Sequence, residues 1–396
     1  KEVISNLKLR ASYGFTGNTE IGVYESLATL GTSNWILGNQ LVSGFFPNKI
    51  PNPDLKWERT GQFDIGLDLG LFNNRLRITT DYYKKKTTDL LYSVAVPATS
   101  GYQTMLKNIG SIENQGYELS IESDNLTGAF SWTTAFNIAF NRNKVLELGG
   151  EEYKEMAEGD GHLKTGSVRR LIVGEPIGVF YGYRFDGIFQ NEEECKQQTS
   201  SASPIGVGLR RYKDLNGDGK VDAANDREIL GDANPKFFGG LTNTFAYKGF
   251  ELNVFLQYSY GNKILNYNAM ELENPTGGQN AYADMVNRWT PENPSNIYPK
   301  ATTNRALLVS DRFIEDGSYL KLKTLSLSYS FPKINLKHIQ GLRLYVTGQN
   351  LLTWTKYRGY DPEVSYRGAS TLEAGEDFGG YPQSRTFMFG IKLDIK

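Results

Sequence analysis

The feature that most constrains this chain is a strict alternation of apolar and polar residues in segments of about a dozen residues. In the last segment, from residue 387 to 396, one face carries only large apolar side chains, namely Phe387, Phe389, Ile391, Leu393 and Ile395. A period of two is the signature of a β-strand that has a different environment on each face. Such segments come in pairs with short turns, and long polar connections join the pairs, which is typical of an up-and-down transmembrane β-barrel.

The alternation predicts an all-β fold, an antiparallel up-and-down sheet with ten strands. We expect them at residues 7–16, 57–70, 75–91, 111–124, 129–142, 237–247, 250–261, 319–331, 341–354 and 384–396. The short turns are 71–74, 125–128, 248–249 and 332–340, and Asn73-Asn74 suits the positive φ of a tight turn. Because barrels have short periplasmic turns and long extracellular loops, both ends of the chain are expected on the periplasmic side.

Composition excludes several classes of function. A net charge of -1 gives no electrostatic reason to expect a nucleic-acid partner. One Cys and two His cannot build a disulfide framework or a Cys/His zinc site. No HExxH, GxSxG, GxxxxGK or CxxC motif occurs, so we predict that the chain is not an enzyme. The apolar strand faces are instead expected to meet outer-membrane lipid, and the polar faces to line a lumen.

One local motif, in the long excursion 143–236, carries metal-binding chemistry. Oxygen ligands at alternate positions, with a glycine that permits a sharp bend, copy the first part of an EF-type calcium loop. The predicted ligands are Asp214, Asn216, Asp218, the backbone carbonyl of Lys220, Asp222 and Asp226. Since Asn225 holds the usual twelfth position, either Asp226 closes the site through a one-residue bulge or the site is weak. We expect a structural calcium ion that pins an excursion otherwise without a core; the alternative is a solvated Asp/Asn/Gly turn.

Longer runs of sequence strongly resemble the SusC/RagA-type TonB-dependent outer-membrane transporters of Bacteroidetes. They include NPDLKWERTGQFDIGLDLGLFNNRLRITTDYYKKKTTDLL (52–91), YKDLNGDGKVD (212–222) and LRLYVTGQNLLTWTKYRGYDPEV (342–364). The resemblance implies the C-terminal part of a plugged barrel of about 22 strands, with the N-terminal plug domain absent. Because the chain starts at Lys1 without Met, we expect a piece of a longer protein or a mature form.

The resemblance also implies active import of a large nutrient across the outer membrane. Glycans are the commonest implied substrate and oligopeptides the second; the implied partners are a SusD-type surface lipoprotein and the TonB complex, which acts on the plug. Aromatic loop residues are candidates for stacking on sugar rings, with packing inside the loops as the alternative: Trp35, Trp289, Tyr357, Tyr360, Tyr366 and Tyr381. Two other classes of protein remain open, a passive porin or structural barrel, and a soluble calcium-stabilised carbohydrate-binding module.

Overall fold

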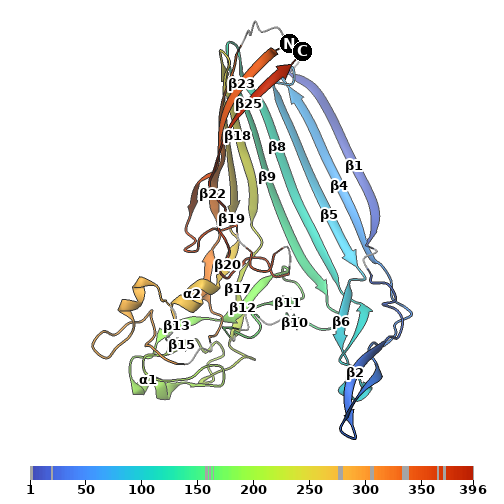
Figure 1. Ribbon diagram of the computed structural model, residues 1–396, viewed down its shortest axis with the longest axis vertical. Helices are drawn as coiled ribbons and strands as arrows, with labels where there is room; N and C mark the ends of the chain where they lie inside the picture. The colour runs from blue at the N-terminus through green and yellow to red at the C-terminus, as the bar shows by residue number, and fades with distance from the viewer. Residues whose placement is uncertain are drawn as a thin grey trace.

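The computed structural model shows a single large antiparallel sheet with an assembly of loops at one end (Figure 1). It describes residues 3–18, 21–156, 159, 162–163, 165–274, 280–303, 307–331, 339–363, 365–368 and 372–395. The sheet has ten strands in the order β1-β4-β5-β8-β9-β18-β19-β22-β23-β25, so strands that follow one another in the sheet also follow one another along the chain. The all-β, up-and-down antiparallel fold predicted from the alternation is confirmed.

All ten predicted strands are present, with ends that differ by a few residues. They are β1 (Ile4–Asn18), β4 (Glu58–Leu71), β5 (Leu76–Thr88), β8 (Ser111–Thr127), β9 (Phe130–Glu147), β18 (Phe237–Tyr247), β19 (Phe250–Tyr260), β22 (Tyr319–Ser330), β23 (Ile339–Thr355) and β25 (Thr386–Ile395). Strand β1 pairs only with β4, and β25 only with β23, among the described residues. These two strands are therefore the open edges of the sheet.

The short turns between β4 and β5, β8 and β9, and β18 and β19 lie at the same end of the sheet as both ends of the chain, and the long connections lie at the other end (Figure 1). Residues 332–338 of the fourth predicted turn, 332–340, lie outside the described residues. At the first short turn, Asn73 and Asn74 have φ values of 60° and 59°, as predicted. The second short turn is present but shorter than predicted, because only residues 128–129 separate β8 from β9, instead of 125–128. Strand β8 continues to Thr127, with a register shift between Asp124 and Leu126, because the extra residue is absorbed as a bulge rather than in the turn.

The two faces of the sheet differ as the alternation requires. Large apolar side chains stand exposed on the outer face, with Leu9 at 72% and Phe389 at 82% exposure. On the inner face, Arg10 bridges two strands, with Nε 3.0 Å from an Asp68 oxygen and Nη2 2.8 Å from an Asp81 oxygen. Among the described residues, no helix has the length and apolar character needed to cross a membrane.

The long connections fall into two groups. The first two carry separate hairpins: β2 (Leu30–Leu37) with β3 (Gln40–Pro47), and β6 (Leu91–Ala95) with β7 (Thr104–Asn108), the second containing η1 (Ala98–Ser100). The other three, 148–236, 261–318 and 356–385, lie together in Figure 1, and we call them the loop body.

Short elements make up the loop body. In 148–236 they are β10 (Tyr153–Glu155), β11 (Arg170–Ile172), β12 (Val179–Tyr183), β13 (Phe185–Ile188), α1 (Glu192–Gln197), β14 (Thr199–Ser200), β15 (Arg210–Tyr212), β16 (Lys220–Val221) and β17 (Arg227–Asp232). In 261–318 they are β20 (Lys263–Asn266), α2 (Tyr267–Leu272), η2 (Ala283–Asn287), η3 (Asp311–Phe313) and β21 (Ile314–Asp316). The described part of 356–385 contributes the strand β24 (Glu376–Asp377).

Candidate functional site

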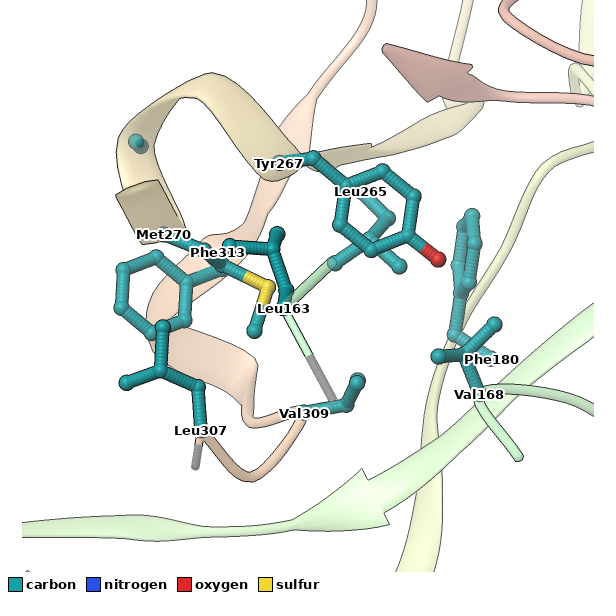
Figure 2. Packing of buried hydrophobic residues seen from close by; sticks show 10 residues of the cluster. Leu163, Val168, Phe180, Leu265, Tyr267, Met270, Leu307, Val309 and Phe313 are labelled. Atoms are coloured by element: carbon teal, nitrogen blue, oxygen red, sulfur yellow. The ribbon is translucent and has the colours of Figure 1, made fainter. Parts of the chain in front are cut away.

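The loop body has a hydrophobic core that the three connections build together (Figure 2). Its ten buried residues are Leu163, Val168, Phe180, Leu265, Tyr267, Ala269, Met270, Leu307, Val309 and Phe313. The first three belong to 148–236 and the others to 261–318, while Phe378 of 356–385 packs against them. The expectation that the long excursion lacks a core is therefore wrong. Residues of three connections pack together in one core, and the long excursion contributes three of its buried side chains.

Backbone pairing crosses between the connections as well. Strand β20 pairs in parallel with β24, so Leu265 lies opposite Glu376, and it pairs in antiparallel fashion with β21. An isolated parallel bridge joins Tyr183 of the first connection to Ser310 of the second. Hydrogen bonds between backbone groups thus fix the register of the three connections relative to one another.

A buried arginine ties the first connection to the third. Arg169, which is 1% exposed, places Nε 2.8 Å from Oε1 of Glu376 and donates from Nη1 to the carbonyl of Gly178 at 2.5 Å. It also donates to the carbonyl of Ala374, and its guanidinium lies 4.2 Å from the ring centre of Phe180. A buried charge costs free energy unless it is paired and hydrogen-bonded, and Arg169 meets both conditions.

A second buried cation anchors the last connection to the inner face of the sheet. Lys321 of β22 is 1% exposed, and its Nζ lies 2.6 Å from Asp361 and 2.5 Å from Glu363. Lys323 also reaches Glu363, at 2.9 Å. The backbone N–H of Gln383 donates to the other oxygen of Asp361 at 3.1 Å. The last connection is therefore held at both Asp361 and Gln383 against the strand.

These contacts set the ionisation of the two carboxylates. Burial alone would raise the pKa of Asp361, but the Lys321 ammonium and two backbone N–H donors lower that pKa below its ordinary value. For Glu363, burial again opposes the ammonium groups of Lys321 and Lys323, which lower the pKa below its ordinary value. Both groups are held in the charged form, as an anchor of opposite charges requires.

A third cluster lies around Glu273, which is buried beside α2. Its carboxylate accepts from Arg312 at 2.6 Å and from Arg358 at 2.8 Å, and Arg358 also pairs with Glu315 at 2.7 Å. Arg358 belongs to the third connection and the other three residues to the second. The cluster therefore joins these two connections by alternating charges.

The structure does not bring the six predicted aromatic residues into one site. Trp289 is buried with its indole N–H donating to Gln190 at 3.0 Å, and Tyr357 is buried with its hydroxyl 2.5 Å from Asp377. Burial and the Asp377 carboxylate raise the pKa of Tyr357. Both rings pack inside the loop body. Trp35 lies on the separate hairpin of β2 and β3.

Three tyrosines of the last connection remain accessible. Tyr360 is exposed, Tyr381 is 93% exposed, and Tyr366 is partly covered because Phe378 meets its ring in an edge-to-face contact with centres 5.6 Å apart. Their role in substrate binding stays a prediction. The Lys321 anchor holds the polypeptide between Tyr360 and Tyr381 at its two ends, so it positions the segment that carries these rings.

The predicted calcium loop is closed by its own backbone. The Asp214 carboxylate accepts from the N–H groups of Gly217 and Gly219, both at 2.7 Å. Asp226 is completely buried and accepts from Leu215 at 2.8 Å and from Asp222 at 2.7 Å. The Asp226 carboxylate therefore joins the start of the motif to its ninth position. The bulge by which it would close a calcium site stays a prediction.

The other predicted ligands hold turns within the same loop. Asn216 accepts from the N–H of Asp218 at 3.2 Å, and Asp218 accepts from that of Lys220 at 2.8 Å. The Lys220 ammonium lies 3.0 Å from Asp222 and, with local backbone N–H groups, lowers the pKa of that carboxyl. Within the described residues, no three His, Cys, Asp or Glu side chains are arranged to hold a metal ion. Calcium binding stays a prediction.

Sequence reasoning missed the anchor formed by Lys321, Asp361 and Glu363. The sequence does contain a signal for the lysine. Lys321 lies between two leucines in a strand that alternates apolar and polar residues, so it belongs to the polar, inner face of the sheet. Its partners lie in the run YDPEV (360–364), which looks like an ordinary turn because of Pro362. Only the structure places that turn beside the strand.

The chain is similar to proteins of one family along most of its length. The family model described as "TonB dependent receptor-like, beta-barrel" matches residues 2–351. TonB-dependent receptor P3 of Formosa agariphila is 41% identical over 397 residues, an alignment that covers 98% of this chain and 39% of that protein. TonB-dependent receptor SusC of Bacteroides thetaiotaomicron is 30% identical over 412 residues, covering 99% of this chain and 38% of that protein.

The fold has a close counterpart among solved structures. The structure titled "Structure of the RagAB peptide transporter" superposes with a TM-score of 0.80 at 28% identity, covering 99% of this chain and 41% of that chain. The chain spans about two fifths of the length of the curated relatives that it matches.

Proposed function

The chain belongs to the TonB-dependent receptor-like β-barrel family of the bacterial outer membrane, and from that premise we propose that it forms the C-terminal part of the barrel of an active importer for a large nutrient. The observation that carries the proposal is the ten-stranded sheet with an exposed apolar outer face and a charged inner face. The apolar outer face can contact lipid, and the charged inner face can be solvated by water in the lumen.

The proposed role of the loop body is to shape the outer mouth of this importer. Three connections share one core and are tied by the buried cations Arg169 and Lys321, so their surface is ordered before a ligand arrives. A preorganised surface loses less entropy on binding than free loops do. The exposed rings of Tyr360, Tyr366 and Tyr381 would then meet the substrate or a partner that covers the mouth.

We propose a glycan or oligosaccharide as the substrate, because the resemblance implies this class first and the accessible tyrosines suit stacking on sugar rings. An oligopeptide is the second candidate, which the likeness to the RagAB peptide transporter supports. The proposed partners are a SusD-type surface lipoprotein at the mouth and the TonB complex, which would act on a plug domain. A soluble carbohydrate-binding module does not fit the family match, and a passive porin would lack dependence on TonB.

The test uses the full-length transporter in its native outer membrane. Cells that lack the gene are compared with complemented cells for growth and uptake on defined oligosaccharides and on defined oligopeptides, with and without an uncoupler of the proton gradient. Energised uptake that needs the gene supports the importer, and the effective nutrient identifies the substrate class. Uptake that survives the uncoupler unchanged would show a passive channel and overturn the proposal.

We further propose that the loop 214–226 binds calcium with a structural role. Two findings support this: Asp226 is returned to the loop despite the shifted position, and Asp214 accepts from Gly219, as a coiled oxygen-ligand loop requires. The carboxylates of Asp218 and Asp222 would have to turn inward from their present partners. The ion would then link the two ends of the loop 214–226 within the first connection, beside β16.

A further inference from the structure

A groove on the outer face of the sheet combines exposed aromatic rings with cations. It has a volume of about 440 Å³, and its lining residues are Tyr13, Phe15, Arg59, Gly61, Phe63, Lys84, Lys86 and Thr88. These residues belong to β1, β4 and β5, which lie side by side (Figure 1). Gly61 opens the groove, because a Cβ atom at this position would lie 3.0 Å from the ring of Phe15.

The strand register places the groove on the apolar, outward face. Tyr13, Phe63 and Lys84 are direct cross-strand neighbours in one row, and Phe15, Gly61 and Lys86 form the next row toward the long connections. Cross-strand neighbours lie on the same face of a sheet. The groove therefore begins among apolar rings and ends among cations at the end of the sheet that carries the loops.

The cations of the groove are only partly neutralised by the protein, through Glu113, which is the cross-strand neighbour of Lys86. Arg59 lies 4.0 Å over the ring centre of Phe15, and neither Arg59 nor Lys86 has a carboxylate partner within the described residues. Lys84 pairs with Glu113 at 3.1 Å. Three positive groups face one negative group, which leaves a net charge of about +2 on an outer face that is otherwise apolar.

We propose that this groove binds an outer-leaflet lipid whose head group carries phosphate. Arg59 and Lys86 would hold the phosphate, since a guanidinium fork and an ammonium group are the usual donors to such oxygens. The acyl chains would lie along Tyr13 and Phe63, in continuity with the lipid-facing surface. The inference rests on the membrane orientation in the proposed function, in which the long connections face outward.

The position of the groove along the strands favours a lipid over a soluble anion. Phosphate groups of a bilayer lie at the boundary of the hydrocarbon layer, where aromatic rings and snorkelling cations also gather. The exposed Trp57 lies near the same end of β1, since a Cβ atom added at Gly17 would be 3.6 Å from its ring. An inner-face cation such as Lys85, one residue away, would not reach that lipid.

The experiment measures lipid binding by the full-length transporter in a neutral detergent. The probe is a fluorescent lysophosphatidic acid, and the measurement is its anisotropy at low and high salt. Arg59→Gln/Lys86→Gln removes two charges from the groove, and Lys8→Gln/Lys85→Gln removes two from the inner face of β1 and β5 as a matched control. At about five-fold per charge near a membrane surface, we expect binding about thirty-fold weaker for the first variant and unchanged for the control.

Several outcomes would overturn the proposal. They are unchanged binding by Arg59→Gln/Lys86→Gln, an equal loss in the inner-face control, and displacement of the probe by inorganic phosphate as readily as by unlabelled lysophosphatidic acid. Heat-modifiable migration on gels verifies that each variant is folded. Substrate uptake by the wild type is a separate readout, so a failure of the importer proposal is distinguished from a failure of lipid binding.

Discussion

Lys321 on β22 and Asp361 in the last long connection form a buried ion pair, with Nζ and Oδ1 2.6 Å apart. The lysine belongs to the wall of the barrel and the aspartate to the loop body. Their contact, extended by Glu363, is the point at which the most accessible aromatic segment, between β23 and β25, is joined to the neighbouring strand β22. The order of the loop body therefore depends on the buried charge of Lys321 in strand β22.

Removing this cation is predicted to release the last connection. In Lys321→Met, the buried carboxylate of Asp361 and the half-buried carboxylate of Glu363 lose their main partner. Breaking a buried ion pair in this way costs about 3–5 kcal/mol. We expect faster hydrogen exchange and new protease cleavage within 356–385, with the strands unaffected. Lys323→Met is the control, because its more exposed pair contributes about 1 kcal/mol or less. Equal effects of both variants would contradict the anchor.

Acid is predicted to weaken the same anchor. The folded-state pKa values of Asp361 and Glu363 are lowered, so their contribution is complete above the unfolded values of about 3.9 and 4.3 and is lost as pH falls through the folded values. The protection of 356–385 against hydrogen exchange, corrected for the pH dependence of intrinsic exchange, should therefore stay constant from neutral pH down to about pH 5 and fall below about pH 4. Lys321→Met should flatten this dependence, and a profile that stays the same would count against it.

Breaking the tie at Arg169 is predicted to loosen the loop body as a whole. In Arg169→Met, Glu376 is left buried with only Arg367 at 3.4 Å, and the carbonyls of Gly178 and Ala374 lose their donor. We expect a local loss of about 3–5 kcal/mol, measured as hydrogen exchange in β24 and around Phe180. Arg184→Met, which removes an exposed pair with Glu228, should change exchange little.

A glycine inside the sheet is predicted to be needed for strand pairing. A Cβ atom on Gly116 would lie 2.5 Å from the backbone oxygen of Phe140 on the neighbouring strand, and 2.6 Å from the hydroxyl of Tyr83. Gly116→Ala should cost about 1–3 kcal/mol and lower the temperature at which heat-modifiable migration is lost. Gly14→Ala meets no atom within 4 Å and should leave that temperature unchanged.

Calcium binding at 214–226 is predicted to protect the first connection of the loop body. In the wild type, added calcium should slow proteolysis of this loop, and a chelator should reverse the effect. Asp214→Ala/Asp218→Ala should abolish both responses. Asp186→Ala, an exposed carboxylate that pairs with Arg211, is the control and should respond as the wild type does. Identical calcium affinity in the double variant would refute the site.

The sequence by itself determined the sheet. A period of two fixes which side chains share a face, and a shift of one residue would move all of them to the other environment, so the pattern locates each strand. The last strand shows this most clearly, since the alternation of Phe387 to Ile395 appears unchanged as the outer face of β25. The Asn73-Asn74 turn was predictable for an equally local reason.

Only the tertiary structure decided how the long connections fold. Their partners lie far apart in sequence, as Arg169 and Glu376 or Lys321 and Asp361 do, and no local pattern records which charge meets which. The same holds for the shared core, because Phe180 and Phe313 belong to connections that have no periodicity of their own. Local repetition in the sequence therefore determined the ten-stranded sheet, while long-range packing and buried charge pairs decided the fold of the loop body.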